Sequence, residues 1–376
     1  MAPPPVRARP EEEDDMTTIA PRTPEQVADE VAGRLFQAGI AAFELLTVGL
    51  GDRLGLYQAL AGHGGPTTAD DLAGSAGVDA RYVREWCEQQ ATAGILDVDD
   101  PAADPAERCY ALPLGAEAVL LDPDSPACVV PLPEFLESAA RVMPALDRAY
   151  RTGGGVPYAD YGVAHAQGGF NRAAFTGRLV SEWLPAVPDL DEALRGGGRV
   201  AELGCGVGWA AIAVARGYPD ATVDAFDADP VSIDAARRNA ADAGVADRVR
   251  FVVADVTDPA LTGDHAGVFA FEMIHDLADP VAALRTARRL TRGPVIVMDE
   301  NVGDVFTVPG GPVDRLFYAA SVLHCLPVGR SAQPSAATGT VMRPATLRRY
   351  AADAGFARVV DLPIEDALFR FYRLEG

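Results

Sequence analysis

The stretch Val200-Ala-Glu-Leu-Gly-Cys-Gly-Val-Gly-Trp209 has the pattern of a buried strand that runs into a glycine turn and then a helix. In an open α/β sheet a ligand lies at the carboxyl ends of the strands, where the first crossover begins. Glycine lets the backbone pass close to such a ligand because no Cβ stands in the way. The stretch therefore predicts a ligand site at residues 202–208, at the carboxyl ends of the strands of a parallel sheet.

Strand patterns alternate with helical patterns from Gly198 to the C-terminus. The predicted strands are 198–203, 221–227, 249–254, 267–272, 294–299, 356–361 and 368–374. Strands that alternate with helices indicate a mostly parallel, doubly wound sheet with right-handed crossovers. The fold class expected for residues 197–376 is α/β, with a seven-stranded Rossmann-like sheet.

The glycine spacing argues against a dinucleotide. A G-x-G-x-x-G fingerprint needs a third glycine where this chain has Trp209, and the absence of Lys from the sequence excludes a phosphate-binding G-x-x-x-x-G-K loop. Glu202 ends the strand just before the glycines, where its carboxylate would repel a pyrophosphate. The same carboxylate would suit a ligand that carries an ammonium group and a sulfonium.

Two further acidic residues follow neighbouring strands. Asp227 ends the second predicted strand and is placed to accept hydrogen bonds from both hydroxyls of a ribose. Asp255 ends the third strand, within reach of an adenine amino group. Ammonium, ribose diol and adenine amine together describe S-adenosylmethionine, which is the cofactor we expect.

The series E-x-G-x-G-x-G, Asp227 and Asp255 resembles the class I S-adenosylmethionine-dependent methyltransferases over about residues 198–376. That resemblance implies methyl transfer with S-adenosylhomocysteine as product. The residues it implies for cofactor binding are Glu202, Gly204, Cys205, Gly206, Gly208, Asp227, Ala228, Asp255, Val256 and Glu272.

The segment Phe271-Glu-Met-Ile-His-Asp276 is similar to the His-Asp pair of plant-type O-methyltransferases. The similarity implies that His275 removes the acceptor proton and that Asp299 or Glu300 orients its imidazole, which has an ordinary pKa near 6.5. The chain departs from that family at Leu277, where an aromatic residue is usual. The alternative is that His275 packs or caps a helix start. A Mg²⁺ site of Glu272, Asp299 and Asn301 is the weaker alternative, and we expect no metal.

Aromatic and polar residues of two distant segments could form an acceptor pocket, although half of them could equally be plain core. They are Tyr158, Tyr161, Phe170, Asn171, Phe317, Tyr318, Ser321 and His324, with predicted helices at 170–184 and 313–326. His324 and Cys325 are adjacent, so on an α-helix their side chains would point about 100° apart and form no dyad.

Residues 22–130 have the pattern of a mainly helical, winged-helix-like domain. A helix over 22–62 precedes a helix that Thr68 and Asp71 open, then a helix at 81–93 and a two-stranded wing from 94–98 and 109–112. Residues 42–121 carry four Arg against thirteen Asp or Glu, too little positive charge for DNA binding. The resemblance to small-molecule O-methyltransferases implies instead that this domain forms a homodimer.

Residues 131–196 are expected to be a helical linker and substrate lid, in which Gly153-Gly154-Gly155 is either a plain linker or a hinge. Residues 1–21 have the composition of a disordered leader, and Met16 could be an alternative start.

The overall composition narrows the function further. A net charge of −22 disfavours nucleic-acid and membrane partners, and five scattered cysteines fit a reducing compartment. We see neither a secretory signal nor an apolar stretch long enough to span a membrane, so we expect a cytoplasmic enzyme. The expected reaction is methylation of a small-molecule hydroxyl, such as one in secondary metabolism. Alternatives are C- or N-methylation, a non-methylating reaction of the same cofactor, or a winged-helix regulator that senses it.

Overall fold

The computed structural model describes residues 22–376, so the expectations of a leader at 1–21 and of a start at Met16 lie outside the described residues. The chain divides into two compact units, residues 1–44 and residues 45–376. The long helix α1 (Pro24–Arg53) belongs in part to each of them.

The predicted helix over 22–62 is in fact two helices. α1 ends at Arg53 and α2 (Leu56–His63) begins after Gly55, whose φ of 69° is left-handed and breaks the helical path. One helix of the described residues, α1, is long and apolar enough to cross a membrane by length and composition alone. The prediction that no stretch reaches that length is therefore wrong. Core helices of soluble proteins and signal sequences pass the same test, so the finding assigns no membrane span.

The winged-helix pattern is present in residues 56–111. Helices α3 (Ala69–Ala76) and α4 (Ala80–Thr92) adjoin a three-stranded sheet of order β1-β3-β2, and β1 (Thr67–Thr68) is a strand that the sequence pattern missed. The wing is formed by β2 (Asp97–Val98) and β3 (Cys109–Ala111). As predicted, the Thr68 side chain accepts a hydrogen bond from the Asp71 N–H at the start of α3.

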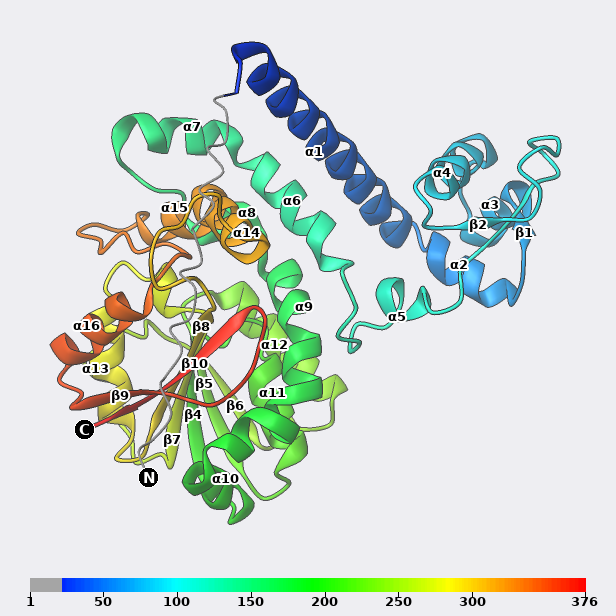
Figure 1. The fold of residues 1–376 in the computed structure, drawn as a ribbon. Helices are drawn as coiled ribbons and strands as arrows, with labels where there is room; N and C mark the ends of the chain where they lie inside the picture. Colours follow the sequence, from blue (N-terminus) through cyan, green and yellow to red (C-terminus); the bar gives the residue numbers. More distant parts are fainter. Residues whose placement is uncertain (1–21) are drawn as a thin grey trace, which may run out of the picture. The chain divides into compact units, whose positions relative to one another are not determined.

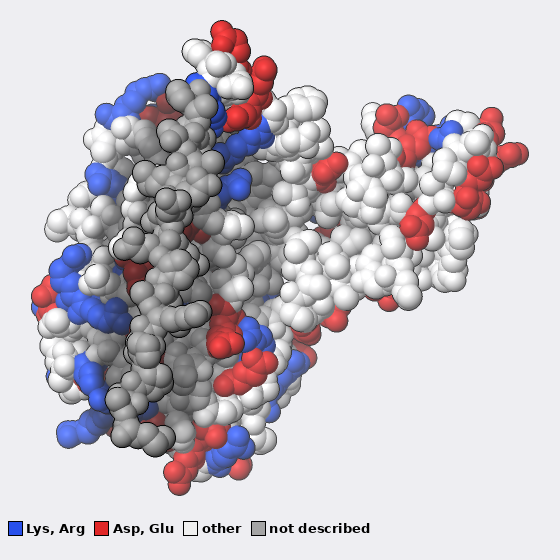
Figure 2. All heavy atoms as spheres, in the orientation of Figure 1, with Lys and Arg blue, Asp and Glu red and all other residues white. Residues whose placement is uncertain are grey.

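Charge on this domain is mainly negative, as Figure 2 shows for its visible face. Two of its four arginines, Arg81 and Arg84, are paired with Glu85 and Asp70. The helix that would enter a DNA groove therefore offers little uncompensated positive charge.

The segment between the winged-helix domain and the C-terminal domain is helical. Its elements are α5 (Glu117–Leu120), α6 (Pro131–Arg141), α7 (Met143–Thr152), α8 (Tyr158–Tyr161), α9 (Ala164–Ala174), η1 (Phe175–Trp183), η2 (Leu184–Ala186) and α10 (Pro188–Arg195). The helix predicted at 170–184 begins earlier, at Ala164, and is π-helical from Phe175. Gly155 lies against the backbone of Pro327, Arg330 and Ser331, where a side chain would collide. Gly155 is thus required for close packing, and the choice between a linker and a hinge for the run stays a prediction.

The C-terminal domain is built on a seven-stranded sheet of order β6-β5-β4-β7-β8-β10-β9, in which only β10 runs antiparallel to the other strands (Figure 1). The strands are β4 (Arg199–Leu203), β5 (Thr222–Asp227), β6 (Val249–Val253), β7 (Gly267–Phe271), β8 (Val295–Glu300), β9 (Arg358–Asp361) and β10 (Phe369–Glu375). Each lies within two residues of its predicted position. The expected α/β class is confirmed.

Helices cover both faces of this sheet, with α10, α11 and α12 on one face and α13 and α16 on the other (Figure 1). The helices that follow β4 in the chain are α11 (Trp209–Gly217), α12 (Pro230–Asp242), η3 (Ile274–Asp276), α13 (Pro280–Leu290), α14 (Pro312–Ala320), η4 (Ser321–Cys325), α15 (Leu326–Gly329) and α16 (Pro344–Ala354). One core joins η1, α10, α11 and α12 to the sheet through residues such as Leu190 and Ile212. The other joins α13 and α16 through Leu284 and Leu347. Two buried faces fix the sheet, and with it the strand ends that carry the site.

Candidate active site

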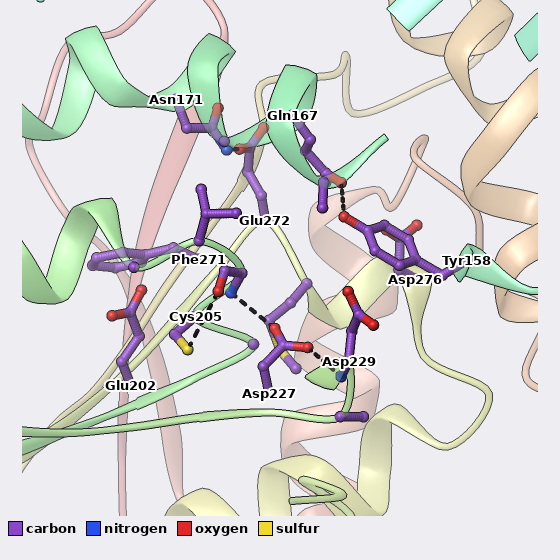
Figure 3. A pocket seen from close by; sticks show the side chains of 18 of the residues that line it. Tyr158, Gln167, Asn171, Glu202, Cys205, Asp227, Asp229, Phe271, Glu272 and Asp276 are labelled. Carbon is purple, nitrogen blue, oxygen red and sulfur yellow. Dashed lines mark hydrogen bonds between the residues drawn. The ribbon is translucent and has the colours of Figure 1, made fainter. Parts of the chain in front are cut away.

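A cavity of about 300 Å³ lies at the carboxyl ends of β4, β5, β6 and β7, where the sequence placed the ligand site. Figure 3 shows its side chains converging from these strand ends and from α9. Every residue predicted for the cofactor lines it, namely Glu202, Gly204, Cys205, Gly206, Gly208, Asp227, Ala228, Asp255, Val256 and Glu272. The fold thus brings residues that are far apart in the sequence together around one cavity.

Asp227 holds the glycine turn in shape. Its Oδ2 accepts a hydrogen bond from the Gly206 N–H at 2.8 Å, and its Oδ1 accepts one from the Asp229 N–H at 2.9 Å. Gly208 begins α11 with a φ of 87°, and a Cβ there would lie 2.8 Å from the Phe251 ring. The turn therefore requires glycine both for its backbone angle and for its packing.

Glu202 presents an unpaired acidic group to the cavity. Its side chain is buried, and its Oε2 has no hydrogen-bond partner among the described residues. Burial raises the pKa of this carboxyl to about 8. A buried carboxyl with one unpaired oxygen fits a ligand that brings a hydrogen-bond donor with positive charge, as the ammonium group of S-adenosylmethionine does.

Helix α9 closes one side of the cavity. Gly168 packs directly against Val207 of the glycine turn, where no Cβ would fit. The Tyr158 hydroxyl donates to Gln167 Oε1 at 3.1 Å, and the Arg172 guanidinium lies 4.2 Å from the centre of the Trp209 ring. Gln167 was not predicted, and Trp209 was considered only as a departure from the dinucleotide pattern, because the walls of this cavity come from segments that are distant in the sequence.

Glu272 lies where two cavities meet. It lines the cofactor cavity and also a second, mostly apolar cavity of about 100 Å³. Its φ of 48° is left-handed, which is uncommon for a residue with a side chain and is found mostly at functional sites. Asn171 Nδ2 donates to its Oε2 (Figure 3), and burial raises the pKa of the carboxyl to about 7.

The second cavity is a candidate acceptor site. The predicted residues that line it are Phe170, Asn171, Glu272, His275, Glu300, Phe317 and His324. The lining residues that were not predicted are Pro131, Leu132, Phe135, Ala166, Gln167, Leu316, Ala320, Cys325 and Thr340. Helical periodicity does not distinguish a residue that lines a cavity from one that packs in the core. No local pattern in the sequence therefore marked the lining residues that were not predicted.

His275 stands at the polar end of the second cavity. Its Nδ1 lies 2.9 Å from Asp299 Oδ1 and 3.1 Å from Glu300 Oε2, while its Nε2 has no hydrogen-bond partner among the described residues. Burial alone would lower the pKa of this imidazole, but the charges of Glu300, Asp299 and Asp276 raise it well above its usual value. The Nδ1 proton is directed at Asp299, so the Nε2 atom, which lies 3.3 Å from Asp276 Oδ1 without a hydrogen bond, is the one that can meet an acceptor.

Three tyrosines predicted for the acceptor pocket do not line the second cavity. Tyr158 lines the cofactor cavity. Asp299 stands behind His275, in a position to orient its imidazole as predicted, and lines neither cavity. The Tyr161 hydroxyl donates to the Leu323 carbonyl, so this buried ring is structural. Tyr318 is partly exposed and its hydroxyl accepts from Arg343, away from the second cavity.

The helix of His324 also differs from expectation. The segment Ser321–Cys325 is π-helical, and Cys325 Sγ lies 3.5 Å from His324 Nδ1, so the two side chains do meet. The prediction that they point apart assumed α-helical geometry and is wrong. Ser321 does not line either cavity and packs against Gly339.

Two groups of described residues have the composition of a metal site. They are His275 with Asp299 and Glu300, and His275 with Asp276 and Cys325. The contact of His275 with Asp299 is accounted for by a hydrogen bond, which occupies the Nδ1 atom. Asn301 belongs to neither group; its Nδ2 donates to the Asp366 carbonyl and its Oδ1 accepts from Arg370 Nε.

Comparisons with known proteins agree with this geometry. Residues 200–293 match the family described as methyltransferase domain, and residues 41–121 match the Rv2258c-like winged HTH domain. No curated protein matches the chain.

Several solved structures share the fold. Human N-acetylserotonin methyltransferase with S-adenosylmethionine is 16% identical, with a TM-score of 0.65 over 92% of this chain and 97% of its own. The mitomycin 7-O-methyltransferase MmcR is 19% identical, with a TM-score of 0.61 over 93% and 98%. RosA of Streptomyces davawensis, an N,N-8-amino-8-demethyl-D-riboflavin dimethyltransferase, is 21% identical, with a TM-score of 0.59 over 92% and 99%.

One assignment follows from the strand order, the glycine turn, the acidic residues at the strand ends and the family matches. The chain carries a methyltransferase domain of the S-adenosylmethionine-dependent class behind a winged helix-turn-helix domain of the Rv2258c-like type.

Proposed function

We propose that the protein methylates a hydroxyl group of a small molecule, in secondary metabolism and in the cytoplasm. The observation that carries this proposal is the junction at Glu272 of the cofactor cavity with a second cavity that contains His275. When bound, S-adenosylmethionine supplies a methyl carbon that the acceptor oxygen attacks as the carbon–sulfur bond breaks and its electron pair stays on sulfur.

This chain's own residues bind the cofactor, orient the acceptor and remove a proton from its hydroxyl. Glu202 pairs with the ammonium group, Asp227 with the ribose, and Asp255 and Val256 with the adenine. In the neutral form of the imidazole, His275 Nε2 takes the hydroxyl proton, and Asp299 holds the ring by its Nδ1 proton. Because the neighbouring carboxylates raise the pKa of His275, this form becomes more populated as pH rises. Holding acceptor and methyl group together in a buried space supplies much of the acceleration.

The protein acts as a homodimer in this proposal. Apolar side chains of α1 are strongly exposed, with Leu35 at 66%, Phe36 at 69% and Phe43 at 74%. A helix with such a face is stabilised when a second copy covers it. Neither nucleic acid nor membrane is a partner in this account.

An assay for S-adenosylhomocysteine tests the reaction. The full chain is incubated with S-adenosylmethionine and a panel of phenols, and mass spectrometry follows the gain of one methyl group. We expect product from the wild type and a loss of roughly 100-fold or more in His275→Ala. Unchanged transfer in that variant would remove His275 as the base and leave C- or N-methylation as the better account, a possibility that the name of RosA keeps open.

A further inference from the structure

The polar end of the second cavity, which we call the acceptor cavity, is acidic. Glu272 and Glu300 line it, and Asp276 and Asp299 lie 3.3 Å and 2.9 Å from the ring nitrogens of His275. No Arg lines the cavity in the described part of the chain, and the sequence contains no Lys. A single imidazole thus faces four carboxyl groups.

Several buried polar atoms here lack partners. Glu300 Oε2, His324 Nε2 and Thr340 Oγ1 are unpaired among residues 22–376, and all three residues are more than nine-tenths buried. Glu300 Oε2 has a charge contact with His275, but the Nδ1 proton points at Asp299. Unpaired buried polar groups are costly, so they indicate a ligand that supplies complementary groups.

His324 adds a hydrogen-bond donor to this set. Rings of Phe135, Tyr158 and Tyr161 surround it with centroids 4.6 to 5.9 Å away, and burial lowers the pKa of its imidazole. Cys325 Sγ lies 3.5 Å from its Nδ1, where the thiol donates. The neutral ring then carries its proton on Nε2, the atom without a partner.

The remaining walls are apolar. They consist mainly of Leu132, Phe135, Phe170, Leu316 and Phe317. The volume of about 100 Å³ is somewhat less than the ~150 Å³ of a dry cavity known to hold one benzene ring. The closed part of the cavity therefore holds at most one ring, and substituents of that ring have to point toward the polar end and the cofactor cavity.

We propose that the acceptor end entering this cavity is a single ring with two hydrogen-bond donors, hydroxyl or amino, and no anionic group. This inference rests on the proposed function and names its substrate class. One donor meets Glu272 beside the cofactor cavity and the other meets Glu300 beside His275, while His324 donates to an oxygen of the ring.

Charge selection follows from the same groups. Burial raises the pKa of Glu272 to about 7 and that of Glu300 well above its usual value, and the charge of His275 offsets this rise only in part. A donor or an ammonium group allows both carboxyls to ionise. An anion would add a further buried negative charge without a partner, which is strongly unfavourable.

Titration calorimetry with ring probes tests the proposal. The full chain, saturated with S-adenosylhomocysteine, is titrated with catechol, 2-aminophenol, toluene and salicylate. We expect catechol and 2-aminophenol to bind at least ~10-fold more tightly than salicylate, which has the same ring and one hydroxyl but a carboxylate. Toluene, which has no donor, should also bind more weakly than catechol.

Two near-isosteric variants localise the effect. Glu300→Gln should weaken catechol binding and reduce the discrimination against salicylate, whereas Asp353→Asn, at an exposed site in α16, should change neither. If Glu300→Gln does not fold, Thr340→Val should weaken catechol ~3-fold or more and leave toluene unchanged.

Salicylate binding as tight as catechol binding would overturn the proposal, and so would the failure of every probe to bind. A first titration with S-adenosylhomocysteine alone distinguishes a failure of the cofactor assignment from a failure of the proposed substrate class. Absence of that binding contradicts the cofactor assignment, while the ring probes are then titrated into the protein alone and still report on the cavity.

Discussion

His275 Nδ1 lies 2.9 Å from Asp299 Oδ1, and both side chains are almost completely buried. The pair joins η3, just after β7, to the end of β8, so the parallel register of two adjacent strands sets its geometry. Asp299 lines neither cavity and acts through His275. This relationship makes the protonation state of one imidazole depend on a carboxylate that the acceptor does not reach.

We expect His275 to titrate well above pH 6.5, because Glu300, Asp299 and Asp276 stabilise its charged form. The raised pKa contributes stability that is fully present below about pH 6.5 and is lost as pH rises through the folded-state value. Side-chain NMR of the five histidines gives the pKa, with His275→Gln for assignment. Asp299→Asn should lower that pKa by about one unit or more. A His275 pKa at or below 6.5 would contradict this account.

Cofactor binding should release a proton from Glu202. Its pKa of about 8 leaves the carboxyl roughly 0.9 protonated at pH 7, and pairing with an ammonium group requires the ionised form. Affinity should therefore rise with pH up to about 8. Calorimetry at pH 7 in two buffers of different ionisation enthalpy counts the released proton, and Glu202→Gln should abolish the release. Equal heats in both buffers for the wild type would argue against the pairing.

The exposed face of α1 should hold two copies together. Phe36→Asp with Phe43→Asp should convert a dimer to a monomer in light scattering coupled to size exclusion, since each buried Phe is worth about 1.5–3 kcal/mol. Gln37→Glu, on the same helix and also exposed, is the matched control and should remain dimeric. A monomeric wild type would contradict the dimer.

The winged-helix domain should not bind DNA. Its four arginines face thirteen acidic residues over 42–121, and phosphate contacts supply most non-specific affinity. A gel shift at about 50 mM salt with random duplex DNA should show no retarded band. A retarded band that disappears as salt rises would favour the regulator alternative instead.

Local sequence was enough to predict the sheet and the cofactor cavity. Glu202 and the glycines share one turn, while Asp227 and Asp255 each end a strand, so the order of strands alone brings them together. The break at Gly55 was missed because the apolar periodicity continues across it.

The acceptor cavity could not be predicted in the same way. Its walls come from α6, α9, α14 and η4, and their faces are set by contacts such as Gly168 on Val207 and Tyr161 on Leu323. The π-helical turns at 175–183 and 321–325 rotate the side chains that follow, which an α-helical period cannot anticipate. The prediction that His324 and Cys325 point apart was wrong for that reason.

Calorimetric titration of the purified chain with S-adenosylhomocysteine tests the central claim most directly, namely that the glycine turn and its three acidic strand ends bind this nucleoside. The account predicts one site per chain, with binding weakened at least ~10-fold in Asp227→Ala, which loses both the ribose contact and the hydrogen bonds to Gly206 and Asp229. Absence of binding to the wild type, or equal binding to Asp227→Ala, would contradict it.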